Sequence, residues 1–170
     1  MNSNHILRWT CLLFVFHCLG CAAEVRVTRE PPPFPDTFMG ARWGESVGQV
    51  KAAIEKDGSG LFQDSTERPP HALYASGTYF GEPATFSYFF TPKSRKLYRI
   101  DVTYKDPAVF EKVRGSLIQI FHAPTYSKRD VDHWAWTHDS LVILQRGPSL
   151  IQISYMNGPF LRINHDEGGT

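Results

Sequence analysis

Cysteine is missing from most of this chain. All three cysteines, Cys11, Cys18 and Cys21, lie within the first 21 of the 170 residues. The remainder therefore cannot form a disulfide, hold zinc through thiolates or use a cysteine nucleophile. The thiol chemistry of this protein is confined to its N-terminus.

An excess of charge is also missing. The chain has 18 Lys and Arg residues and 17 Asp and Glu residues. Arg8 is the one charged residue among the first 21, so the rest carries 17 of each sign and no net charge. Nucleic acids and anionic bilayers attract proteins through surplus positive charge. We therefore expect no nucleic acid as a partner of the folded part.

Motifs for cofactors and metals are absent as well. The sequence contains no GxGxxG, no P-loop and no HExxH, so no cofactor is expected. Acidic and histidine residues do crowd residues 130–139, but His133 and His138 are five positions apart and point to opposite faces of a strand. Metal sites need ligands that converge, and we interpret this segment as a surface loop without a metal.

The first 21 residues have the pattern of an export signal. Arg8 precedes the apolar run WTCLLFVFHCLG, which is too short to span a bilayer. The run ends at Gly20 and Cys21, and a small residue before a cysteine resembles the lipobox of bacterial lipoproteins. The resemblance implies that Cys21 is acylated and anchors the protein to a membrane. Because Ala22 stands where some bacterial families use aspartate for inner-membrane retention, it points to the outer membrane, with the domain facing the periplasm.

Ordinary signal peptidase cleavage near residues 22–23 is the alternative interpretation of the same segment. The small side chains of Ala22 and Ala23 suit that enzyme. The product would then be a soluble periplasmic or secreted protein, without the membrane anchor that acylation of Cys21 would supply.

Proline marks the next segment. Residues 22–36 contain four prolines and charges of both signs, a composition that favours extended, polyproline-like chain. We interpret them as a tether that leads to a single domain at residues 37–163, because a length of this order usually builds one core. The polar sequence of residues 164–170, NHDEGGT, is typical of a disordered tail.

A first amphipathic helix is predicted after Ser46. Ser46 and Gln49 have the spacing of a capping box, in which each side chain accepts from the backbone amide of the other residue. Gly58 supplies a left-handed stop. Three apolar residues fall on one face of this helix: Val47, Val50 and Ile54.

The same residues spell a GxSxG motif around Ser46. In α/β-hydrolases this motif follows a buried strand of a large parallel sheet. The preceding sequence FMGARW is not such a strand, and capping already accounts for the serine. We therefore predict that the protein is not an enzyme, and a serine hydrolase at Ser46 is kept only as an alternative.

Alternating apolar residues predict a three-stranded antiparallel meander over residues 72–105, with breaks at GEP and PKSR. A loop at residues 91–95 that opposes Tyr88 to Tyr98 would bring the apolar residues of both strands to one face. The predicted core face consists of Leu73, Ala75, Tyr79, Phe86, Tyr88, Phe90, Tyr98, Ile100 and Val102.

A second helix is predicted from Asp106 and Pro107, an N-cap followed by the residue favoured at the first helical position. Its apolar stripe would end near Phe121 and cover the meander. Further strands follow, with turns near His138 and Gly147. The expected fold class is α+β, an antiparallel sheet of about five to six strands packed against two amphipathic helices, in the order helix, three-stranded meander, helix, two to three strands.

Four aromatic residues are the candidates for a binding site. The alternation assigns Trp43, Phe89, Trp134 and Trp136 least clearly to the core. Exposed aromatic side chains mark surfaces that bind a protein partner or a glycan. Exposure of both Trp134 and Trp136 would favour glycan or peptidoglycan binding over protein binding.

Trp43, Gly44 and Ser46, in the sequence RWGESVGQV, resemble the WG-x-S helix start of uncharacterised bacterial envelope lipoproteins. The order of helix and antiparallel sheet is similar, more loosely, to the small lipoprotein of the outer-membrane assembly machinery and to the β-lactamase-inhibitor-protein fold. These resemblances imply protein binding on a sheet face without catalysis. The expected function is a non-catalytic interaction or scaffold module of the bacterial cell envelope, with another envelope protein as its partner.

Overall fold

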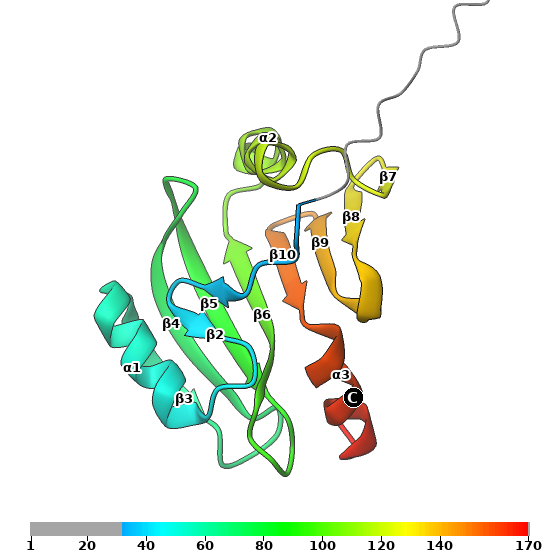
Figure 1. The fold of residues 1–170 in the computed structure, drawn as a ribbon. Helices are drawn as coiled ribbons and strands as arrows, with labels where there is room; N and C mark the ends of the chain where they lie inside the picture. Colours follow the sequence, from blue (N-terminus) through cyan, green and yellow to red (C-terminus); the bar gives the residue numbers. More distant parts are fainter. Residues whose placement is uncertain (1–31, 170) are drawn as a thin grey trace, which may run out of the picture.

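The computed structural model describes residues 32–169 (Figure 1). This part of the chain contains three α-helices, α1 (Val47–Asp57), α2 (Phe110–Phe121) and α3 (Gly158–Asp166). Its strands are β1 (Thr37–Phe38), β2 (Ala41–Arg42), β3 (Gly60–Ser65), β4 (Ala72–Tyr79), β5 (Glu82–Phe90), β6 (Leu97–Tyr104), β7 (Tyr126–Lys128), β8 (Val131–Ala135), β9 (Leu141–Arg146) and β10 (Ile151–Met156).

Eight strands form one antiparallel sheet, in the order β3-β4-β5-β6-β10-β9-β8-β7. The two-residue strands β1 and β2 form a separate hairpin. The hairpin, α1 and α2 contribute buried residues to one hydrophobic core with the sheet, so they cover the same face of it. Neither the hairpin nor α1 nor α2 covers the opposite face, which we call the open face, and α3 packs beside β6 at one end of the sheet.

The sheet consists of two similar halves. In each half one helix precedes four strands: α1 precedes β3 to β6, and α2 precedes β7 to β10. Each set of four is hydrogen-bonded in chain order, and the last strands of the two sets, β6 and β10, pair antiparallel at the centre. The first strands of the two sets, β3 and β7, therefore lie at the two edges.

The α+β class and the antiparallel sheet agree with the sequence, but the predicted number of strands is wrong. The sheet has eight strands rather than five or six, and the hairpin adds two more. The strands that were missed lie largely at the edges, where β3 and β7 are mostly exposed and show no apolar alternation. Alternation reports burial on one face of a strand, so strands with little burial leave no such signal.

Both predicted helix starts are confirmed. The backbone N–H of Ser46 donates to Oε1 of Gln49 at 3.0 Å, as the capping box requires. Oδ1 of Asp106 accepts from the backbone N–H of Ala108 at 2.8 Å and caps a short 3₁₀ turn that leads into α2. Local hydrogen bonds of this kind depend on neighbouring residues alone, which is why the sequence predicts them well.

The predicted register between β5 and β6 is wrong by two residues. Tyr88 pairs with Ile100, not with Tyr98, and the loop extends from residue 91 to residue 96. The pairing shifts between Phe89 and Phe90, where an irregularity adds one residue to one strand. Because the register error is even, the other predicted side chains still face the core, but Leu97 replaces Tyr98 in it because of the added residue.

The folded domain also begins earlier and ends later in the sequence than predicted. Residues 164–169 are not a disordered tail, because α3 extends to Asp166 and Asn164 is buried. The oxygen of the Asn157 side chain accepts from the backbone N–H of Phe160, so Asn157 caps α3. Residues 32–36, predicted as tether, pack on the domain through Phe34.

The carboxylate of Glu167, just beyond α3, should make the stability of the folded protein depend on pH. This carboxylate accepts from the backbone N–H groups of Lys93 and Ser94 at 2.7 and 3.0 Å. Desolvation raises the pKa of Glu167, but hydrogen bonds from Ser94, Lys93 and Thr91 outweigh it and lower the pKa from 4.5 to about 2. A lowered carboxyl pKa contributes stability above the unfolded value, and this stability is lost as the pH falls toward 2.

We therefore expect Glu167→Gln to destabilise the protein at pH 7. The difference between the variant and the original chain should shrink as the pH falls from 4.5 to about 2, where the original carboxyl is also neutral. Urea unfolding of both chains across this pH range measures the difference. A difference that stays constant with pH would contradict the anchoring role of the carboxylate.

Candidate binding surface

The open face carries a continuous row of side chains across seven strands. Each member of the row is the direct pairing partner of the next, so all of them point to the same side of the sheet. From β4 to β7 this central row consists of Tyr74, Ser87, Asp101, Ser154, Ile143, His133 and Tyr126.

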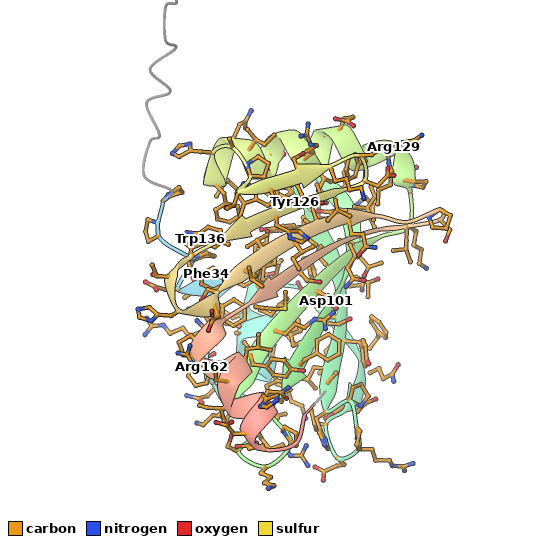
Figure 2. The ribbon with its side chains drawn as sticks, turned by 90° about the vertical axis from the view of Figure 1, so that its right-hand side faces the viewer. Phe34, Asp101, Tyr126, Arg129, Trp136 and Arg162 are labelled. Atoms are coloured by element: carbon orange, nitrogen blue, oxygen red, sulfur yellow. The ribbon has the colours of Figure 1, made fainter. Side chains whose placement is uncertain are left out.

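A buried carboxylate lies at the middle of this row. Asp101 is only 6% exposed, although it faces away from the core (Figure 2). The guanidinium of Arg99 donates to both of its oxygens, at 2.7 and 2.6 Å, and the amide of Gln152 donates to Oδ2 at 3.0 Å. The same amide contacts the hydroxyl of Ser154 at 3.0 Å. Forked pairs of this kind hold both partners in one geometry.

Aromatic rings surround the polar centre. The guanidinium of Arg99 lies 5.1 Å from the centre of the Phe89 ring, a cation-π geometry. Tyr74 stacks obliquely on Phe62 of the edge strand β3, with ring centres 6.4 Å apart. On the other half of the sheet, Tyr126 packs near His133. Phe89, one of the four candidates from the sequence, therefore belongs to this surface.

The charge of the open face is low. Its strand positions within residues 72–156 carry three charged side chains, Arg99, Asp101 and Lys128, and the first two neutralise each other. Aliphatic residues such as Leu141, Ile143 and Met156 occupy other positions. Surfaces that bind proteins are enriched in aromatic residues, Met and Arg and poor in Lys, Glu, Asp and Ser. The open face has aromatic residues, Met and Arg and little charge, but it also carries Ser76, Ser87 and Ser154.

The other candidates from the sequence do not reach the open face. Trp134 is 2% exposed and lies in the hydrophobic core, where its indole N–H donates to the carbonyl oxygen of His122 at 2.9 Å. Trp43 and Trp136 are half-buried on the helix side. Trp134 is therefore a core residue, and its predicted role in partner binding is not supported by its position.

Trp43 and Trp136 hold the chain's own N-terminal segment. The indole N–H of Trp43 donates to the carbonyl oxygen of Pro35 at 2.7 Å, and that of Trp136 to the carbonyl oxygen of Pro32 at 2.6 Å. The ring of Phe34 lies between them, 5.6 Å from Trp43 and 5.3 Å from Trp136. Figure 2 shows Phe34 beside Trp136. We call this arrangement the tryptophan clamp.

Ser46 is placed as a helix cap. Its hydroxyl lies 2.8 Å from Oε1 of Gln49, the same atom that accepts its backbone N–H. Gly44 has a left-handed φ of 78°, and the ring of Phe160 from α3 occupies the space where a Cβ would stand. The first glycine of the GxSxG motif is thus required by packing and by backbone conformation.

The acidic and histidine residues of the segment 130–139 are dispersed. Asp132 pairs with Arg114 and Asp139 with Arg162, each through a charged hydrogen bond. Within residues 32–169 no group of three His, Cys, Asp or Glu side chains is placed to hold a metal ion. The predicted lipidation site Cys21 lies outside the described residues.

The polar centre around Asp101 is the feature that sequence reasoning missed. The alternation placed Arg99 and Asp101 on the polar reverse of the sheet, but their burial depends on Gln152, which is 51 residues away. Among the described helices none is long and apolar enough to cross a membrane. No protein-family model, no curated protein and no solved structure matches this chain.

Proposed function

We propose that this protein is a non-catalytic lipoprotein of the cell envelope that binds another envelope protein through the open face of its sheet. The single observation that carries the binding proposal is the composition of the open face. It presents aromatic and aliphatic side chains around a prearranged Arg99–Asp101 pair, and the hairpin, α1 and α2 all lie on the other face. A rigid surface loses little conformational entropy when a partner binds.

A protein partner is favoured over a glycan by the positions of the tryptophans. Flat, exposed indole rings are the usual platforms for sugar rings, but Trp134 is buried and Trp136 holds the N-terminal segment. Binding of a glycan or peptidoglycan through these aromatic residues therefore has less support. A serine hydrolase at Ser46 has the least support, because its hydroxyl contacts Gln49 and, among residues 32–169, no base that could activate it.

The membrane anchor is a separate part of the proposal and rests on the lipobox-like sequence at Cys21. We expect full-length protein from cells grown with a labelled fatty acid to carry the label and to fractionate with the outer membrane. Cys21→Ser should abolish the label and release the protein into the soluble periplasm. A Cys21→Ser variant that is processed and fractionates like the original chain would contradict lipidation.

Site-specific photocrosslinking in intact cells tests the binding surface. A photoreactive residue at Ser87 or Ile143 of the central row should give one discrete adduct, of the same mass from both positions. The matched control places it at Ala52, an exposed residue of α1 on the other side of the molecule. We expect little adduct from that position, because α1 lies on the helix-covered face.

The proposal is tested by the yield of crosslinked adduct at the two open-face positions compared with the yield at Ala52. Equal adducts from Ala52 and from the central row would indicate random collisions rather than binding. No adduct from either open-face position, in cells where the protein is folded and correctly located, would overturn the proposed binding surface.

A further inference from the structure

A cavity lies at the opposite end of the fold from α2, where the C-terminal end of α3 meets the loops before β4 and after β5. It has a volume of about 310 Å³. Its walls come from Pro69, Pro70, Phe90 and Pro92, and its polar lining comes from His71, Tyr98 and Asn164. Phe90 belongs to the hydrophobic core, and no residue of the central row lines this cavity.

The walls of this cavity are held in place by hydrogen bonds. The carboxylate of Glu167 joins the end of α3 to the loop after β5 through the N–H groups of Lys93 and Ser94. The backbone N–H of Phe90 donates to the carbonyl oxygen of His71 at 2.9 Å, which joins that loop to the one before β4. The cavity is therefore formed before any ligand arrives, as in most small-molecule sites.

Two buried side chains in the cavity have unused polar groups. Tyr98 is 6% exposed and Asn164 is 4% exposed. Within residues 32–169, no hydrogen bond involves the Tyr98 hydroxyl or the Asn164 side-chain amide, and neither group is sealed from solvent. Both side chains line the cavity, so these polar groups are available to a ligand that enters it.

His71 adds a third polar group with a defined role. Its Nδ1 lies 2.9 Å from the carbonyl oxygen of Thr66. A carbonyl oxygen can only accept, so Nδ1 carries the proton and Nε2 is the acceptor of the neutral ring. None of the residues that line the cavity is Asp, Glu, Lys or Arg. The lining thus offers donors and acceptors without a formal charge.

We propose that this cavity binds one neutral sugar ring that carries an N-acetyl group. The apolar faces of Phe90 and the prolines match the C–H face of a pyranose, and the hydroxyl of Tyr98 with Nε2 of His71 matches its hydroxyl groups. The Asn164 amide has both a donor and an acceptor, as has the acetamide group of the sugar. This site does not depend on the proposed protein-binding surface.

Methyl N-acetyl-β-glucosaminide is the probe for this proposal. Saturation-transfer NMR with the full-length protein in detergent micelles should show transfer to the acetamide methyl group. The dissociation constant should be on the order of 1 mM, as expected for a ligand of this size. Glucosamine, which is cationic at neutral pH, should bind at least several-fold more weakly, because the lining has no carboxylate to pair with it.

Tyr98→Phe is the variant that tests the site. It removes only a hydroxyl that has no protein partner, so the melting temperature should be unchanged while binding of the probe weakens several-fold. Tyr79→Phe, which removes a hydroxyl on the helix-covered face outside this cavity, is the matched control and should leave binding unchanged. The absence of saturation transfer, equal affinity for glucosamine, or equal affinity in the folded Tyr98→Phe variant would each overturn the proposal.

Discussion

Replacing Trp134 by alanine is expected to lower the free energy of unfolding by about 3–5 kcal/mol, the usual cost of truncating a buried tryptophan. Its ring is 2% exposed and packs 6.3 Å from the ring of Phe121 on α2. The variant also loses the hydrogen bond from the indole to His122. The melting temperature should fall by roughly 10–20 °C for a domain of this size.

Trp136→Ala is the control for Trp134→Ala, because it removes a tryptophan that is only half-buried. Trp136 is half-buried and contacts the N-terminal segment, so its loss should cost clearly less than the loss of Trp134. Thermal unfolding of both variants measures the difference. If Trp134→Ala proves too unstable to isolate, Trp134→Phe keeps most of the buried ring and should lie between the two. Equal melting temperatures for Trp134→Ala and the original chain would show that Trp134 is not a core residue.

Asp101→Ala is expected to destabilise the sheet by about 2 kcal/mol. Removing one partner of a buried ion pair leaves the other without its charge complement, at a cost of about 3–5 kcal/mol. The side chain of Arg99 is 33% exposed, so water replaces part of the lost interaction and reduces this cost. The same variant should reduce photocrosslinking from the central row, because Arg99 then loses its fixed orientation.

A double-mutant cycle separates the ion pair from its surroundings. Arg99→Leu combined with Asp101→Leu removes both charges and leaves neither unpaired, so it should cost less than the sum of the two single substitutions. Urea unfolding of the four proteins gives the coupling. Strict additivity would contradict an energetic role of the pair, even if Asp101→Ala alone is destabilising.

The sequence predicts those features of the fold that depend on neighbouring residues. Ser46 with Gln49, and Asp106 with Pro107, mark the starts of two helical segments because capping bonds form within three or four positions. The alternation in β5 and β6 predicts which side chains enter the core. The exact register between the two strands depends on an irregularity near Phe89, and no local pattern in the sequence marks it.

The third helix could have been found. Asn157, Gly158 and Pro159 combine an N-cap residue with proline at the start of a helix. The polar residues that follow suggest a free tail, but Asn164 is buried against the loops at the end of the sheet. Burial of a polar residue by distant segments gives no signal in the sequence, and the cavity beside Asn164 could not be predicted for the same reason.

The environments of the four binding candidates also depend on distant segments and not on neighbouring residues. The aromatic residues that the sequence singles out are distributed over three environments: Trp134 in the core, Trp43 and Trp136 in the clamp, and Phe89 on the open face. Trp134 and Trp136 both pack on Phe121 of α2, but the indole of Trp134 donates to His122 and that of Trp136 to Pro32 of the N-terminal segment. A tryptophan in an alternating strand cannot reveal from sequence alone which of these environments it occupies.

The tryptophan clamp limits how far the domain can stand from a membrane. With Pro32 fixed to Trp136, only residues 22–31 separate the domain from a lipid on Cys21, a distance of at most about 35 Å. A free tether up to residue 36 would allow about 50 Å. The domain of a lipidated protein would thus stay close to its membrane. The open face would then meet partners in or close to the same bilayer rather than across the full width of the periplasm.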